Sequence, residues 1–364
     1  MSAPPAYRLL AIQSHVVTGY VGNRSATFPA QLLGWDVDAL NTVQFSNHTG
    51  YGRWGGHRFD AQQLNDILTG MDQNGLVRHD RLLTGYTPSP EALAVVEAFI
   101  ISLRKQNPDV IYLLDPVMGD MDRGMYVNPD VLPIYRRMLS LSTIICPNQF
   151  EAQVLVGHEI TTLSSLQHAL HVLHYKYKVP NVVITSLELP ESEMKKIGAT
   201  PTMADGQPAM LLVGSSVQED GSDASWLLQF PTLGEYFSGV GDLFASLVLS
   251  RFSCRGTDVP GPARTSDEVA AAPREPAAGD ECTLPVARAV MYAVASLQHV
   301  LQRTRETMIA EGQRQGIDPF QPAHLAEVDE RVKIMRLREL RIVQSAQEIL
   351  APSILHRPRW TGPL

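Results

Sequence analysis

The sequence has no long apolar run, and its first residues do not show the pattern of a secretory leader. Nowhere do the 364 residues approach the ~20 consecutive apolar residues that a membrane-spanning helix needs. Residues 1–5 read Met-Ser-Ala-Pro-Pro, without the basic segment and following apolar stretch of a signal peptide. We therefore expect a protein that is neither embedded in a membrane nor secreted.

Cysteine is scarce as well. There are three, Cys146, Cys254 and Cys282, an odd number whose spacing matches no metal site. A disulfide framework is disfavoured on this count. Free thiols are typical of a reducing compartment, which indicates the cytoplasm, with the nucleus as the alternative.

An excess of basic residues is also missing. Lys and Arg number 30 against 38 Asp and Glu, which gives a formal net charge of −8. Nucleic-acid surfaces need clustered cations, so a small-molecule partner is favoured over a nucleic acid. One basic stretch, residues 331–341, is expected to be a solvated face, with anion binding as the less favoured alternative.

Short β-branched and leucine-rich runs alternate with longer helical patterns. This alternation is typical of βα units and a mostly parallel sheet, so we expect an α/β fold. Ser89 and Asn148 stand where N-caps are expected, before the patterns that follow them. The expected strands cover residues 8–13, 37–43, 81–84, 110–114, 143–146 and 182–185.

Two regions break the alternation. Residues 253–285 hold no aromatic residue and are rich in Pro, Gly, Ala and charge, which favours a disordered insertion between two helices. Residues 190–208 are expected to form a loop or a loose hairpin. Neither region separates two folds, so we expect a single domain over residues 1–364.

The most informative segment is 237–244, Phe-Ser-Gly-Val-Gly-Asp-Leu-Phe, which leads into an apolar helical pattern. Gly239 and Gly241 let backbone amides crowd together at a helix start, which makes an anion-binding site. Asp242, on the first turn, can accept a proton from a hydroxyl while the amides receive negative charge. The competing interpretation is an ordinary glycine-rich turn with Asp242 favoured by the helix dipole.

The Gly-Val-Gly-Asp stretch resembles the signature of the ribokinase-like superfamily. Within it, the similarity narrows to the pyridoxal kinase family and runs from about residue 7 to residue 345, apart from the two irregular regions. The resemblance implies a three-layer α/β/α fold with a central, mostly parallel sheet. The segments that carry it, in the family's order, are IQSHV (12–16), GYVGNR (19–24), VQFSNHTGY (43–51), LTGY (83–86), DPVMGD (115–120) and PNQFE (147–151).

Residues for binding a flat substrate follow from the first strands and the resemblance. Ser14 ends the first strand, where open α/β sheets bind ligands, and the resemblance implies a bond to a pyridine nitrogen. Tyr86 ends another strand and its ring can stack on a heterocycle. Val21 and Val43 resemble apolar pocket walls and Thr49 a polar contact. Core packing is the competing interpretation for Tyr86 and both valines.

The nucleotide side is expected at the same sheet edge. Asp115 follows one apolar strand, and Asn148 and Glu151 follow the next; carboxylates placed there suit Mg²⁺. Asn148 as a simple N-cap and Glu151 as a helix-dipole partner remain alternatives. By resemblance, Asp115 helps form a monovalent-cation site for K⁺, and Glu151 and Asn148 hold the Mg²⁺ shell. The nucleotide contacts implied by the resemblance are Asp115, Tyr126, Asn148, Glu151, Thr185, Ser186, Phe237, Gly239 and Gly241.

Three departures from the family pattern bear on these expectations. Val240 stands where many members carry Thr, which leaves the backbone amides of the anion site intact. Cys146 stands where the mammalian-type pattern has Thr, so dependence on a monovalent cation hinges on whether a side chain or a carbonyl holds it. The lid at residues 120–126 is shorter than in mammalian-type members, so the closure kinetics of their lids are not expected to apply to this one.

The leading hypothesis is ATP- and Mg²⁺-dependent phosphorylation of the 5′-hydroxymethyl of pyridoxal, pyridoxine or pyridoxamine. Asp242 is the expected base and the backbone from Gly239 through Val240 and Gly241 the anion site. A hydroxymethylpyrimidine kinase is the alternative within the class, and a catalytically weak vitamer-binding or regulatory protein the alternative outside it. A dinucleotide-dependent dehydrogenase is disfavoured because residues 19–22 lack the fingerprint's third glycine. The resemblance also implies a homodimer.

Overall fold

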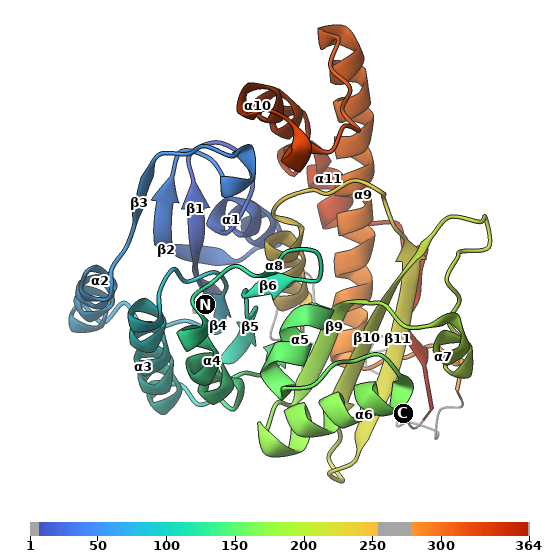
Figure 1. Ribbon diagram of the computed structural model, residues 1–364. Coiled ribbons are helices and arrows are strands. Elements are labelled where there is room, and N and C mark those ends of the chain that lie inside the picture. Colours follow the sequence, from blue (N-terminus) through green and yellow to red (C-terminus); the bar gives the residue numbers. More distant parts are fainter. Residues whose placement is uncertain (1–6, 254–277, 363–364) are drawn as a thin grey trace, which may run out of the picture.

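A computed structural model describes residues 7–253 and 278–362. Ten strands form one sheet in the order β12-β11-β10-β9-β8-β5-β4-β1-β2-β3, and β6 and β7 pair in a small hairpin (Figure 1). The strands are β1 (Arg8–Val16), β2 (Asp36–Phe45), β3 (Gly56–Arg58), β4 (Arg81–Thr84), β5 (Ile111–Leu114), β6 (Gly119–Asp120), β7 (Gly124–Met125), β8 (Ile144–Ile145), β9 (Asn181–Leu187), β10 (Ala209–Val217), β11 (Asp223–Pro231) and β12 (Arg359–Trp360).

Helices cover both faces of the large sheet, as Figure 1 shows. Ser89 caps α3 and Asn148 caps α5, as expected from the sequence. The helices are α1 (Asn23–Leu32), α2 (Ala61–Gln73), α3 (Pro90–Gln106), α4 (Leu132–Leu139), α5 (Gln149–Val156), α6 (Leu163–His171), α7 (Glu191–Lys196), α8 (Val240–Arg251), α9 (Pro285–Gln315), α10 (Val328–Leu337) and α11 (Ala346–Leu350), with a 3-10 turn η1 (Thr49–Tyr51) among the shorter pieces.

The core has two halves because side chains alternate across the sheet. Along β1, Leu10 and Ile12 face one layer and pack with residues of α2 to α6. Leu9 and Ala11 face the other layer, formed by α1, α8 and α9. This three-layer α/β/α arrangement confirms the expected fold class.

The six central strands, β2, β1, β4, β5, β8 and β9, are mutually parallel. Their carboxyl ends therefore meet at one edge of the sheet. The chain order reverses at β1, which has β2 on one side and β4 on the other. Such a switch point is where open α/β sheets bind ligands. Of the residues expected to bind the substrate, Val21 follows β1 and Tyr86 follows β4, whereas Ser14 lies inside β1, which runs on to Val16.

Three expectations for segments outside the regular alternation of strands and helices need correction. Residues 190–208 are not all loop, because Glu191–Lys196 form helix α7. Of the insertion expected at 253–285, residues 254–277 lie outside the described part, and Gly279 and Cys282 donate backbone hydrogen bonds to the C-terminal segment at 2.8 Å each. The basic stretch 331–341 is not simply a solvated face, because Arg338 is buried.

Arg338 is buried because its guanidinium satisfies backbone acceptors. It donates to the carbonyl oxygens of Pro319 at 2.8 Å and Gln321 at 2.9 Å. Its next neighbour, Glu339, is buried as well. The part of this stretch that follows α10 thus serves packing rather than solvation.

Across residues 7–253 and 278–362, no helix has both the length and the apolar character needed to cross a bilayer.

Candidate active site

The glycine-rich segment forms a helix start open to an anion. Helix α8 begins at Val240, with Gly239 as its N-cap in the left-handed region at φ 82°. A side chain at Gly239 would collide with the carbonyl oxygen of Tyr20, whereas one at Gly241 would meet no atom within 4 Å. The first N–H groups of a helix lack acceptors within it, so those of α8 are available to an anion. Position 239 therefore requires glycine.

Asp242 lies on the first turn of α8 beside those amides. One carboxylate oxygen, Oδ2, accepts a hydrogen bond of 2.8 Å from the backbone N–H of Gly22. Burial raises the pKa of Asp242 above its ordinary value, and the Gly22 N–H opposes part of that rise. A carboxylate with a raised pKa is a stronger base, and its orientation is fixed by the loop after β1.

Ser14 lies close to the same loop. A bulge between Gln13 and Ser14 interrupts the pairing of β1 with β2. Gly22, at φ 53°, packs so tightly on Ser14 that a side chain at position 22 would collide with the Ser14 carbonyl and hydroxyl oxygens. Gly22 therefore contacts both Ser14 and Asp242, which brings the expected ring-nitrogen contact and the expected base together.

The expected apolar walls also come together. Val21 and Tyr86 pack against a small buried cluster that contains Val43 with Val16 and Phe45. This cluster lies at the ends of β1 and β2, apart from the two main halves of the core. Core packing was the competing interpretation for these side chains. Val43 is buried, as core packing requires, whereas Val21 and Tyr86 are half-buried and keep surface that can face a ligand.

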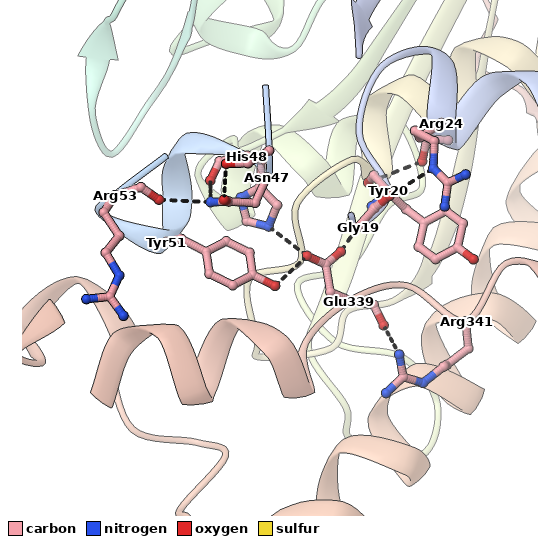
Figure 2. Close-up of polar contacts among 11 residues, drawn as sticks. Gly19, Tyr20, Arg24, Asn47, His48, Tyr51, Arg53, Glu339 and Arg341 are labelled. Atoms are coloured by element: carbon pink, nitrogen blue, oxygen red, sulfur yellow. Dashed lines mark hydrogen bonds and ion pairs between the residues drawn. The ribbon is translucent and has the colours of Figure 1, made fainter. Parts of the chain in front are cut away.

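Thr49, the expected polar contact, is exposed in the 3-10 turn η1 after β2. Its hydroxyl is free to face a ligand, but its neighbours on the turn point elsewhere. The His48 and Tyr51 rings pack edge to face at 4.8 Å and both reach toward Glu339 (Figure 2).

The carboxylate of Asp115 interacts electrostatically with those of Glu151 and Asp242. Asp115 is buried, and burial together with the charges of Glu151 and Asp242 raises its pKa well above the ordinary value. Burial likewise raises the pKa of Glu151 to about 7, although backbone N–H groups oppose the shift. A concentration of negative charge out of water is destabilising unless a cation offsets it. Asp115 thus connects the expected metal ligands with the expected base.

Asn148 and Glu151 form a capping box at the start of α5. The Asn148 side chain accepts from the N–H of Glu151 at 2.9 Å, and Glu151 accepts from the N–H of Asn148 at 3.0 Å. The other oxygen of Glu151 accepts from the N–H of Met118 at 2.9 Å, and the Asn148 amide donates to the Gly119 carbonyl at 2.8 Å. The N-cap expected at Asn148 is therefore confirmed, and Glu151, expected as a helix-dipole partner, completes a capping box. Lone pairs of Glu151 remain for a further ligand.

The remaining expected nucleotide contacts divide into exposed and buried ones. Thr185 and Ser186 are half-buried on β9, and the Thr185 N–H donates to the Pro147 carbonyl next to Asn148 at 3.0 Å. Tyr126 is 51% exposed just after β7, so its ring is free to cover a ligand. Phe237 packs instead in the core half formed with α8 and α9. The Phe237 side chain therefore anchors residues 237–242, the anion loop, in the core. Only the Phe237 backbone is available to contact a nucleotide.

The β6–β7 hairpin reaches over to the anion loop. The guanidinium of Arg123, in its tip, lies 4.6 Å from the centroid of the Tyr236 ring. Tyr236 stands three residues before Gly239, and its ring is 50% exposed. This cation–π contact joins the two segments that flank the expected phosphate site.

Two of the departures from the family pattern, Val240 and Cys146, lie in the site. Val240 is half-buried at the start of α8 and packs against the core, which leaves the backbone amides in place. The Cys146 thiol is buried, and burial together with Asp115 raises its pKa, so it stays protonated. A neutral thiol is a poor ligand for a hard cation such as K⁺. If a monovalent cation binds here, the carbonyl of residue 146 is the better ligand.

Sequence reasoning missed two features of the site. The Gly22 N–H that holds Asp242 comes from a residue 220 positions away in the sequence. Glu339 contacts both the loop after β1 and the turn η1 (Figure 2). It lies in the basic stretch 331–341, where the sequence gives no reason to single out one acidic residue. No local pattern marks either contact, because both depend on the tertiary fold.

Within the described ranges, no three His, Cys, Asp or Glu side chains are grouped closely enough to hold a metal ion on their own. Mg²⁺ in phosphotransfer sites is held by one or two carboxylates together with substrate phosphates and water. The buried, mutually repelling carboxylates of Asp115 and Glu151 fit such an ion.

Comparisons with known proteins identify the family. A family model described as phosphomethylpyrimidine kinase matches residues 77–218. The pyridoxal kinase of Bos taurus is 37% identical over 362 residues, covering 96% of each chain, and that of Arabidopsis thaliana is 34% identical over 95% of this chain and 92% of its own. The pyridoxal kinase of Leishmania donovani in complex with ADP and pyridoxamine superposes with a TM-score of 0.72 at 28% identity, over 97% of this chain and 99% of its own. The chain therefore belongs to the pyridoxal kinase family.

Proposed function

We propose that this protein transfers the γ-phosphoryl group of ATP to the 5′-hydroxymethyl group of pyridoxal, and also accepts pyridoxine and pyridoxamine. The observation that carries the proposal is the position of Asp242, on the first turn of a helix whose N-cap is a glycine in the left-handed region. A base and an anion site are thereby placed side by side. The full-length relatives named pyridoxal kinase support the choice of acceptor.

In the proposed reaction, Asp242 accepts the proton of the acceptor hydroxyl as its oxygen attacks the γ-phosphorus. The bond between that phosphorus and the bridging oxygen of ADP breaks. The N–H groups at the start of α8 receive the negative charge of the transferring group. Ser14 orients the pyridine ring, and Val21, Val43 and Tyr86 exclude water from it. Thr49 supplies a polar contact at the rim.

On the nucleotide side, Asp115 and Glu151 would hold Mg²⁺, which neutralises phosphate charge when it is bound. Asn148, Thr185 and Ser186 line the same edge of the sheet. A K⁺ ion near Asp115 is part of the proposal only through backbone carbonyls, given the protonated Cys146 thiol. Turnover assays with Mg²⁺, and with K⁺ replaced by a bulky organic cation, test both ions.

The hydroxymethylpyrimidine kinase alternative has one observation in its favour, the description of the family model that matches residues 77–218. That match covers the middle of the chain, whereas the pyridoxal kinase relatives match it almost throughout. Competition between pyridoxal and hydroxymethylpyrimidine for the same enzyme separates the two. Preferred turnover of the pyrimidine would overturn the proposal.

The second alternative, a weak enzyme that chiefly binds vitamers, predicts binding without turnover. Purified protein with Mg²⁺ and ATP should convert pyridoxal to its phosphate, and calorimetry should give the affinity for pyridoxal in parallel. Tight binding with no product would favour the regulatory alternative. The presence of Asp242 beside an open helix start supports the enzyme.

Two further properties belong to the proposal by resemblance to the family. We expect a homodimer, which light scattering of the purified protein would detect. We expect the protein in the cytoplasm, with the nucleus as the alternative, which a fluorescent fusion would distinguish.

A further inference from the structure

Glu339 is a buried acid that holds two loops together. It is 9% exposed and follows α10 in the C-terminal part of the chain. One oxygen, Oε2, accepts from the backbone N–H of Tyr20 at 3.0 Å. The other, Oε1, accepts from the Tyr51 hydroxyl at 2.8 Å and lies 3.3 Å from Nε2 of His48. Figure 2 shows the carboxylate between these groups.

The first of the two loops leads directly to the expected base. Tyr20 and Gly22 belong to the segment between β1 and α1. Glu339 fixes the Tyr20 N–H, and two residues later the Gly22 N–H fixes Asp242. The Tyr20 carbonyl lies where a side chain at Gly239 would collide, so the same loop also packs against the helix start. A displacement at Tyr20 therefore moves the partner of Asp242.

The second loop carries the rim of the acceptor pocket. His48 and Tyr51 flank Thr49 in and before η1. The amide of Asn47 donates to the Arg53 carbonyl at 2.9 Å, so the turn is closed on itself as well as tied to Glu339. Through these contacts Glu339 links this turn to the loop after β1 (Figure 2).

The contacts require a carboxylate at this position. Burial alone would raise the pKa of Glu339, but the hydrogen bonds from His48, Tyr51 and the Tyr20 N–H outweigh it and hold that pKa below its ordinary value. The acid is therefore ionised, and each of its oxygens acts as an acceptor. Gly19, at φ 96°, passes so close that any side chain there would collide with the carboxylate.

We propose that Glu339 is a positioning residue for the acceptor side of the site: it sets the loop that orients Asp242 and the turn that carries Thr49. The proposal rests on the function proposed above and adds a residue outside the expected site. In this proposal Glu339 acts through the residues that it contacts and touches neither the vitamer nor ATP. The competing explanation is a purely structural tie, which would stabilise the fold without affecting how the vitamer binds.

The test is Glu339→Gln, with Glu330→Gln as the matched control because Glu330 is exposed on the neighbouring helix α10. A carboxamide has one acceptor oxygen, so it cannot accept hydrogen bonds from both the Tyr20 N–H and the Tyr51 hydroxyl, as the two carboxylate oxygens do. We expect KM for pyridoxal to rise about tenfold, the equivalent of one lost hydrogen bond, and kcat to fall a few-fold. KM for ATP should change less than about twofold, and the control should match wild type.

Tyr51→Phe provides a second variant that leaves the carboxylate in place, in case Glu339→Gln does not fold. It should raise KM for pyridoxal in the same selective way but by less. Because the two substitutions remove a shared contact, the double variant should lose less than the sum of the single losses.

The results separate the two proposals. A wild-type protein without turnover would refute the proposed function. Normal wild-type turnover with an unchanged KM for pyridoxal in both variants, or a lower Tm as the only effect, would refute the positioning role and leave the proposed function standing. Equal rises in the KM values of pyridoxal and ATP would also count against it, since both side-chain partners of Glu339, His48 and Tyr51, flank Thr49 on the acceptor side.

Discussion

Replacing Asp242 separates its chemical role from its structural one. Asp242→Asn keeps an oxygen that can accept from the Gly22 N–H at the 2.8 Å position but removes the proton acceptor. A general base contributes on the order of 10² to 10⁴ in rate, so we expect kcat to fall by that factor, or ~3–5 kcal/mol in activation free energy. KM for pyridoxal should stay near the wild-type value, because no wall of the pocket changes.

The stability of the same variant should move in the opposite direction. Burial raises the pKa of Asp242, which means that the ionised form is disfavoured in the folded protein at neutral pH. The neutral amide removes that penalty, so the ligand-free variant should be at least as stable as wild type at pH 8. Asp242→Ala, by contrast, leaves the Gly22 N–H without its acceptor and should lose about 1–3 kcal/mol.

The assay is ADP release over a range of pyridoxal concentrations, with urea unfolding of each ligand-free variant in parallel. Loss of activity combined with equal or greater stability is the signature of a functional carboxylate. If Asp242→Asn turned over within about tenfold of wild type, the assignment of the base would be wrong.

Further predictions concern other parts of the site. Ser14→Ala should raise KM for pyridoxal more than it lowers kcat, and steady-state kinetics showing the reverse would contradict the ring-nitrogen role. Gly239→Ala should abolish turnover and lower Tm, because the residue has φ 82° and faces the Tyr20 carbonyl; an active variant in a turnover assay would contradict the anion site. Asn148→Ala should lower the free energy of unfolding by about 1–2 kcal/mol through loss of the α5 cap, and denaturant titration checks this. In a pH–rate profile, kcat should decline as pH falls through a pKa above the ordinary 3.8, because Asp242 must be ionised to act. In Asp242→Asn the part of the decline that is due to residue 242 should vanish, and the part due to Glu151, whose pKa is raised to about 7, should remain.

The parts of this structure that the sequence could predict are those with a local cause. The apolar runs of the six parallel strands, the caps at Ser89 and Asn148, and the glycine-rich start of α8 each carry a signal within a few residues. The resemblance then placed Ser14, Tyr86 and Asp115 at one edge of the sheet. That edge follows from the parallel order of the strands.

What the sequence could not predict depends on partners far along the chain. The antiparallel strands β10 and β11 were not anticipated, and no local pattern shows that they pair antiparallel, with Gly214 opposite Trp226. Arg338 and Glu339 look like members of a solvated basic stretch, yet both are buried by acceptors and donors from distant segments. The role of Phe237 as a core residue was likewise hidden by its position beside the glycines.

The bond between Glu339 and Tyr20 spans 319 residues, which has a consequence for synthesis on the ribosome. Proteins leave the ribosome from the N-terminus, at roughly 5–20 residues per second. The first strands and helices can therefore fold early. The loop that orients Asp242 gains its bond to Glu339 only after nearly the whole chain has been synthesised. A nascent chain stalled before residue 339 should have most of its sheet but not a settled acceptor pocket, so vitamer affinity would be acquired last.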